Sequence, residues 1–196
     1  MPFSNYIYEY YDGISSGNIT VGKWVRLLYE YIVKGLQEGL FTFNAKKANK
    51  AIRFIENFCH HCEGRTDLLK LELWQKAAVS VMFGIVEEDG TRVFREVFIV
   101  IGRKNGKTLF ASAVIAYMAY LDGEYGAKIY CLAPKLEQAN IVYDNFYQMI
   151  KKRTGAFRPI EEAPFRYLHR RKQYRDQAAC VQREEIRWLQ SAFSRE

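Results

Sequence analysis

The residues best suited to chemistry in this chain lie in one short segment, Gly102–Thr108, which reads Gly-Arg-Lys-Asn-Gly-Lys-Thr. An apolar, β-branched run at Val97–Ile101 precedes it, and an Ala-rich helical pattern at Leu109–Leu121 follows it. A buried strand, a glycine-bearing loop, a Lys-Thr pair and a helix are the parts of a phosphate-binding loop. In such a loop, backbone N–H groups and the helix dipole hold an anion.

The two residues that end the loop have expected roles. Lys107 would reach the outer phosphates, and the Thr108 hydroxyl would hold Mg²⁺. The spacing departs from the usual G-x-x-x-x-G-K-[ST], which needs glycine at position 101, because Ile101 stands there and Gly102 comes one place later. A basic surface turn is the alternative interpretation, but the flanking strand and helix patterns favour the phosphate loop.

Length and composition describe a globular protein of one domain, or of one domain and a fragment. The 196 residues are 49% hydrophobic and 26% charged. No apolar run approaches the roughly 20 residues that span a bilayer, and the first residues lack a signal-peptide layout. We therefore expect a cytoplasmic location.

The net charge of +7 belongs mainly to the end of the chain. Residues 151–196 hold 12 Lys and Arg against 6 Asp and Glu, whereas residues 1–150 are nearly balanced. The basic character therefore describes the tail and says little about the body.

Cys59-His60-His61-Cys62 has the spacing of half a zinc site. No second pair follows to complete a tetrahedron, so we interpret the segment as the last turn of a helix that ends at Gly64. Cys131 lies in an apolar run and is expected in the core.

Four helices are expected outside the loop region, at Gly22–Gly39, Ala45–Cys62, Lys70–Phe83 and Leu136–Lys152. Asn44 is expected to cap the second, and Asp89-Gly90 to form a turn. The inward residues expected are Val25, Leu28, Tyr29 and Ile32 in the first helix, and Ile141, Val142, Phe146 and Ile150 in the last.

Ala127–Ala133 is expected to form a second strand, which gives the order β–loop–α–β–α. This order predicts an α/β fold with an incomplete parallel sheet of the P-loop NTPase type, preceded by an N-terminal helical segment. The expected divisions are a helical lead-in at 1–88, a core at 89–152 and a tail at 153–196.

Residues 10–152 resemble the N-terminal ATPase part of the large terminase subunit of tailed bacteriophages. The resemblance rests on Arg53–Phe58 (R-F-I-E-N-F), Leu71–Gln75 (L-E-L-W-Q), Phe94–Phe98 (F-R-E-V-F) and the Gly102–Thr108 loop. That family carries an offset phosphate loop of this kind.

The resemblance implies an ATP- and Mg²⁺-dependent motor that packages double-stranded DNA. Implied partners are the phage portal protein, the small terminase subunit and further copies of the chain. Arg103 or Lys104 would reach the γ-phosphate as a cis arginine finger, and Lys107 and Thr108 would bind phosphate and Mg²⁺. Trp74 and Gln75 resemble the segment that meets adenine, although core packing explains Trp74 equally well.

Hydrolysis also requires an acidic pair at the end of a later apolar strand. Neither Glu161-Glu162 nor Glu184-Glu185 follows such a strand, so both are interpreted as solvated charges. We therefore expect this chain to bind nucleotide without turning it over.

Residues 161–195 change sharply in composition, and reverse translation read one nucleotide later gives terminase-like words. We interpret the tail as a frameshifted, non-native segment of a truncated chain. A natural basic tail that contacts DNA phosphates is the alternative. The remaining functional alternatives are another P-loop ATPase and a non-catalytic DNA-binding module.

Overall fold

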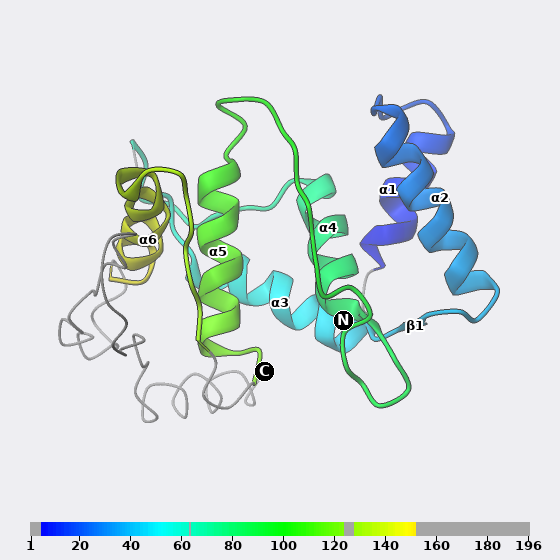
Figure 1. Cartoon of the computed structure of the whole chain (residues 1–196). Helices are drawn as coiled ribbons and strands as arrows, with labels where there is room; N and C mark the ends of the chain where they lie inside the picture. Colours follow the sequence, from blue (N-terminus) through cyan, green and yellow to red (C-terminus); the bar gives the residue numbers. More distant parts are fainter. Residues whose placement is uncertain (1–4, 63, 124–127, 152–196) are drawn as a thin grey trace. The chain divides into compact units, whose positions relative to one another are not determined.

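The computed structural model describes residues 5–62, 64–123 and 128–151 (Figure 1). The predicted tail, with both of its glutamate pairs, lies outside the described residues. The helices are α1 (Tyr6–Ser15), α2 (Lys23–Gln37), α3 (Ala45–Phe58), α4 (Leu73–Gly84), α5 (Lys107–Tyr120) and α6 (Leu136–Lys151), and the strands are β1 (Thr42–Phe43) and β2 (Ile85–Val86). The described part is thus helical with one small sheet, which is consistent with an incomplete α/β domain.

The chain divides into two compact units. The described residues of Met1–Glu56 and Lys70–Ile101 form the first, and those of Asn57–Leu69 and Gly102–Glu196 form the second. The first unit contains the segment that resembles an adenine-side motif, and the second contains the loop. Each unit is described separately below.

The first unit is built on a helical core. Asn5 caps α1, because its side chain accepts a hydrogen bond of 3.2 Å from the Ile7 N–H. From α1, Ile7, Tyr10 and Ile14 are buried in one hydrophobic cluster with residues of α2 and α4. The Tyr10 and Tyr29 rings meet edge to face with centroids 4.9 Å apart, a favoured aromatic geometry.

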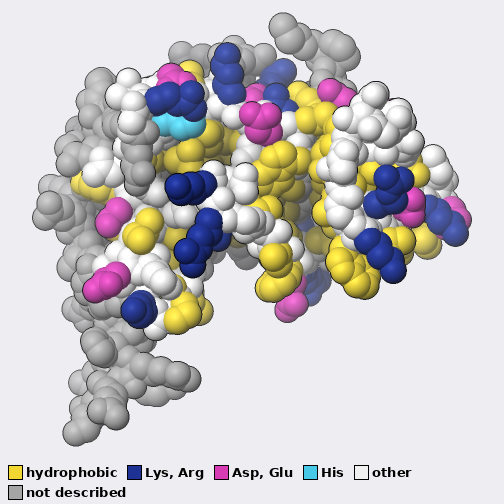
Figure 2. Space-filling model, turned by 90° about the horizontal axis from the view of Figure 1, so that it is seen from above, with side chains coloured by type: hydrophobic (Ala, Val, Ile, Leu, Met, Phe, Trp, Pro, Cys, Tyr) yellow, Lys and Arg dark blue, Asp and Glu magenta, His cyan; other side chains and the backbone are white. Residues whose placement is uncertain are grey.

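The expected helix at Gly22–Gly39 is confirmed as α2, but its inward face is only partly the predicted one. Tyr29 and Ile32 are buried as expected, whereas Val25 and Leu28 are 36% and 47% exposed. Apolar residues occupy more than one face of this helix, so periodicity alone did not select the buried face. Figure 2 shows hydrophobic side chains that reach the surface beside Lys and Arg side chains.

The short sheet pairs β1 with β2 in antiparallel register. Asn44 caps α3 as predicted, since its side-chain oxygen accepts the Lys47 N–H at 3.0 Å. The turn at Asp89-Gly90 is also confirmed, because the Gly90 N–H donates to the Glu87 carbonyl. Hydrogen bonds from Thr91 hold the pKa of Asp89 below its ordinary value.

The predicted parallel sheet is not formed among the described residues, and the prediction of a buried strand before the loop is wrong. Residues 94–101 and 128–133 belong to no helix or strand. Phe98 is 94% exposed and Leu132 is 90% exposed. An extended segment becomes a strand only when neighbours satisfy its backbone groups, and none of the described residues pairs with these two segments.

The second unit is built on α5 packed against α6. Both helices agree with the sequence prediction to within two residues. In α6, Phe146 is buried and Ile141 is half exposed, so the inward face is rotated from the predicted one. The side chain of Ile150, which was also predicted to point inward, lies outside the described part of the structure.

The helix expected at Ala45–Cys62 ends earlier, at Phe58. Beyond it, His60 forms an isolated antiparallel bridge with Leu68, and the Leu69 N–H donates to the Cys59 carbonyl. The Cys-His-His-Cys segment is therefore extended backbone and not a last helical turn.

A search of the described residues for a helix long and apolar enough to cross a membrane finds none.

Candidate functional site

The loop joins α5 so that its Lys-Thr pair opens the helix. Lys107 and Thr108 are the first two residues of α5, and Gly106 precedes them with a left-handed φ of 67°. The first backbone N–H groups of a helix have no partner within the helix, and the helix dipole makes this end partially positive. The start of α5 thus has the polarity that an anion requires.

The loop has a second left-handed position. Lys104 has φ 64°, and among the described residues it is the only one other than glycine with a positive φ. Left-handed residues next to right-handed ones turn successive N–H groups toward one side of the chain, which forms an anion-binding concavity. The left-handed conformation costs a lysine about 1–2 kcal/mol, so the backbone at Lys104 is strained.

The Gly102–Thr108 loop is exposed to solvent. Residues 102–107 are exposed and Thr108 is half-buried. The Asn105 amide nitrogen donates a hydrogen bond to the Arg103 carbonyl at 3.4 Å. The charged groups of Arg103, Lys104 and Lys107 therefore remain available to a ligand.

The helix behind the loop is anchored more firmly. The hydroxyl of Ser112 is fully buried and lies 2.9 Å from both the Thr108 carbonyl and the Val142 carbonyl. Its single proton is shared between the first turn of α5 and the middle of α6. Phe110, Ala113 and Ala116 are also buried, so α5 is a fixed support for the exposed loop.

The segment that resembles an adenine-side motif forms the start of α4 in the first unit. The Glu72 N–H donates to the Gln75 side-chain oxygen at 2.9 Å, an arrangement that helps to cap the helix. Gln75 is 9% exposed. Trp74 is partly buried and packs against the hydrophobic cluster of α1 and α2, as core packing predicts.

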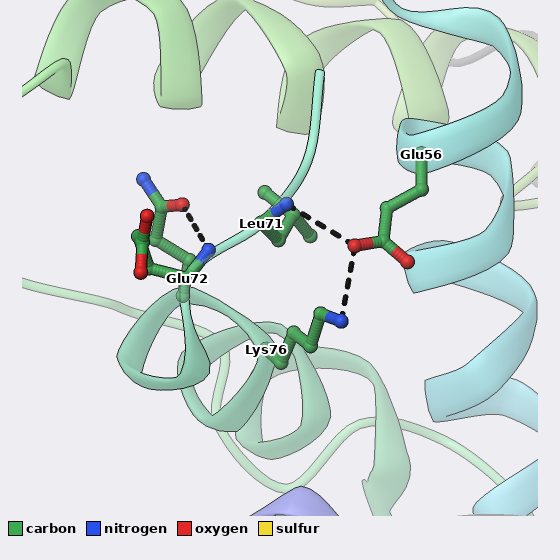
Figure 3. A network of polar contacts seen from close by, with 5 residues as sticks. Glu56, Leu71, Glu72 and Lys76 are labelled. Carbon is green, nitrogen blue, oxygen red and sulfur yellow. Dashed lines mark hydrogen bonds and ion pairs between the residues drawn. The ribbon is translucent and has the colours of Figure 1, made fainter. Parts of the chain in front are cut away.

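A polar network that the sequence reasoning missed holds this helix start (Figure 3). One oxygen of the Glu56 carboxylate lies 3.1 Å from the Leu71 N–H and 3.1 Å from the Lys76 ammonium. Lys76 also lies over the Tyr6 ring, 5.2 Å from its centroid. Glu56 lies in the segment Arg53–Phe58, and Leu71 lies in the segment Leu71–Gln75. Both segments carry the family resemblance, but the sequence did not indicate that they contact each other.

The Cys-His-His-Cys segment does not gather a metal site among the described residues. Cys59 is buried, and burial raises the pKa of its thiol, with Cys62 as a smaller cause. The Cys62 sulfur lies 3.1 Å from the Asn145 carbonyl oxygen of α6. Burial therefore favours the neutral thiol of Cys59.

Taken by themselves, the two segments offer different chemistry. The Gly102–Thr108 loop offers backbone N–H groups and three cationic side chains, which suit a polyphosphate. The start of α4 offers a buried amide of fixed orientation, which suits a group that both donates and accepts hydrogen bonds.

Comparison with known protein families matches residues 73–173 to the terminase large subunit, ATPase domain. The match covers 101 of the 196 residues and extends into the predicted tail. No curated protein and no solved structure gave a significant match. On the family match, which includes both α4 and the loop, the chain belongs to the ATPase domain family of terminase large subunits.

Proposed function

We propose that this chain is the ATPase part of a DNA-packaging motor and that its Gly102–Thr108 loop binds the phosphates of ATP. The observation that carries the proposal is the position of Lys107 and Thr108 at the first turn of α5, after left-handed residues at 104 and 106. Family membership supports the same activity.

The residues of the loop have different roles in binding ATP. Backbone N–H groups of Gly102, Arg103, Lys104, Asn105 and Gly106 form the cradle. Lys107 binds the outer phosphates, and Arg103 or Lys104 reaches the γ-phosphate. The Thr108 hydroxyl, at the second position of α5, holds Mg²⁺, which when bound neutralises charge on the phosphate oxygens.

The base-side role belongs to Gln75, with Trp74 beside it. A glutamine amide pairs with the donor and acceptor edge of adenine through its oxygen and its NH₂ group. No acceptor for the NH₂ group of Gln75 is present among the described residues, which leaves these donors for a ligand. The packing of Trp74 makes it a support for Gln75 more than a platform for the base.

Family membership also supports the proposed partners. These are double-stranded DNA, the phage portal protein, the small terminase subunit and further copies of the same chain. Turnover requires an acidic pair that the sequence reasoning did not find, so nucleotide binding is the property to test in this chain.

Displacement of a fluorescent ATP analogue tests the proposal. Lys107→Ala should abolish binding, since an uncompensated phosphate charge is left at the loop. Lys135→Ala, which removes an exposed lysine outside the loop, should bind as the wild type does. Equal binding by the Lys107→Ala and Lys135→Ala variants would overturn the assignment of the loop.

A DNA-binding module is the second candidate, and the charge of the tail favours it. The excess of 12 basic over 6 acidic residues in 151–196 would give DNA affinity that falls steeply with salt. Deletion of residues 153–196 should then remove the affinity. DNA binding that survives the deletion would eliminate the candidate.

A further inference from the structure

We propose that the exposed face of α3 binds the phosphate backbone of a DNA duplex through Lys46, Lys50 and Arg53. The inference deepens the proposed function, since it rests on double-stranded DNA being a partner of this chain and assigns a surface to that partner. The three residues belong to the first unit, whereas the Gly102–Thr108 loop belongs to the second.

The three cations form one stripe along the helix. Positions 46, 50 and 53 are separated by four and three residues, the spacing that places side chains on the same helical face. A rise of about 1.5 Å per residue makes the stripe about 10 Å long. Residues 45–55 include no Asp or Glu, so no acidic side chain of this segment interrupts the stripe.

The opposite face of α3 is buried. Its apolar side chains are at most 2% exposed, namely those of Ala48, Ala51, Ile52 and Ile55. Lys46 and Arg53 are exposed, and Lys50 is half-buried. The helix cannot rotate about its axis without exposing these apolar side chains, so the stripe remains directed at the solvent.

The other charged groups of α3 are engaged within the first unit. The Lys47 ammonium donates to the Gly90 carbonyl. The Glu56 carboxylate holds the start of α4 (Figure 3). Neither Lys46 nor Arg53 forms a side-chain hydrogen bond or an ion pair with another described residue. Their charges are therefore available to a partner.

The chemistry of this face favours the phosphates of a duplex over other partners. None of the large hydrophobic side chains exposed in the described part of the structure lies in α3. A protein interface is anchored by aromatic or apolar side chains, and a membrane-surface helix needs a free apolar face, so α3 fits neither. Single-stranded DNA also needs aromatic groups on which its bases stack. Lys and Arg side chains by themselves suit the phosphate rows of a duplex.

Helix α2 of the same unit provides the contrast. It also carries three exposed cations, at Lys23, Arg26 and Lys34. Glu30 and Glu38 lie among them or next to them, and the Glu38 carboxylate is 3.7 Å from the Lys34 ammonium. Because acidic groups repel DNA phosphates, α2 should not bind the duplex.

The experiment measures binding of the full chain to a fluorescent DNA duplex of mixed sequence, by anisotropy at several salt concentrations. Each phosphate contact contributes about 0.9 to the slope of log affinity against log salt concentration. A variant with Lys46→Gln, Lys50→Gln and Arg53→Gln should therefore have a slope shallower by about 2 to 3. At low salt its affinity should fall by about tenfold or more.

The control makes the same three charge changes on α2, with Lys23→Gln, Arg26→Gln and Lys34→Gln, and should keep the wild-type slope. The basic tail is identical in all variants, so its contribution cancels. Glutamine has a helix propensity close to that of Lys and Arg, so both helices should form.

Single variants test the stripe if the triple variant does not fold. Arg53→Gln should make the slope shallower by about 1, whereas Arg53→Lys, which retains the charge, should keep the slope. Equal slopes for Arg53→Gln and Arg53→Lys would overturn the assignment of Arg53.

Three results of the triple variants would overturn the inference. Equal slopes for the α3 and α2 variants would show that only the net charge, or another part of the chain, determines DNA binding. A wild type without DNA affinity would also refute the inference. A loss of affinity for polyglutamate as large as that for DNA would assign the stripe to acidic proteins instead.

Displacement of the fluorescent ATP analogue tests the proposed function separately, and the α3 variant should bind ATP as the wild type does. If ATP binding depends on Lys107 while the α3 and α2 variants agree in slope, this inference fails and the function stands. A wild type that does not bind ATP would refute the function of the loop, whatever the DNA slopes show.

Discussion

The Gly102–Thr108 loop and the start of α4 differ in what gives each its shape. The loop is exposed, makes few side-chain hydrogen bonds and takes its shape from left-handed backbone at two positions. The start of α4 is partly buried and is held by side chains, among them Glu56 and Gln75. The first region should therefore respond to changes of backbone conformation, and the second to changes of hydrogen-bonding groups.

The largest effect is expected from Glu56→Ala at the start of α4. The variant leaves the Leu71 N–H and the Lys76 ammonium without their shared acceptor, and a bond to a charged group contributes roughly 1.5–3 kcal/mol. We expect the free energy of unfolding to fall by about 2 kcal/mol. Glu56→Gln should recover part of it, as measured by urea denaturation.

That prediction would fail if Glu30→Ala, the exposed control, cost as much as Glu56→Ala. The network would then contribute nothing beyond helix propensity, and the contrast between the two regions would disappear.

The sequence predicted the loop but not this network, for physical reasons. A glycine, a Lys-Thr pair and an Ala-rich helix are local signals, and α5 begins at Lys107, two residues before the predicted start at Leu109. Glu56 and Leu71 are fifteen residues apart, and no periodicity reports that one accepts a bond from the other. Their juxtaposition depends on how α3 packs near the start of α4.

The sheet was mispredicted for a related reason. The run at Val97–Ile101 has the β-branched composition of a buried strand, but composition does not supply a partner for its backbone groups. The short strands β1 and β2 pair instead, each only two residues long. The helices α2 to α6, whose hydrogen bonds are internal, were predicted to within a few residues, whereas α1 (Tyr6–Ser15) was not predicted.

A backbone change should affect the loop next most strongly. Gly106→Ala adds a Cβ that meets no atom within 4 Å, so the cost is the left-handed conformation alone, about 1–2 kcal/mol. We expect ATP affinity to fall by about tenfold in the displacement assay, because the loop relaxes away from its binding shape. Gly22→Ala, at an equally open glycine with φ −69°, is the matched control and should leave ATP affinity unchanged.

Ser112→Ala should give a smaller effect on the support of the loop. The variant removes a buried hydroxyl that bridges α5 and α6, which contributes about 1 kcal/mol to the free energy of unfolding. Thermal denaturation should show the loss, and Ser112→Cys, which keeps a weak donor, should lose less. An unchanged melting temperature in Ser112→Ala would show that the bridge does not hold the two helices.

The smallest effect is expected from Lys104→Gly, and its sign differs from the others. Glycine removes the strain of φ 64° but gains freedom in the unfolded chain, so we expect a net stabilisation of about 0.5 kcal/mol. Lys128→Gly, at an exposed position without positive φ, should destabilise slightly. If both variants lost stability equally, Lys104 would not be strained.

The most direct test of the account is a calorimetric titration of the wild-type chain with ATP and with tripolyphosphate, in the presence of Mg²⁺. The account predicts saturable binding of both ligands, because the Gly102–Thr108 loop recognises the phosphates. Absence of binding by either ligand would contradict the claim that the chain binds ATP through this loop.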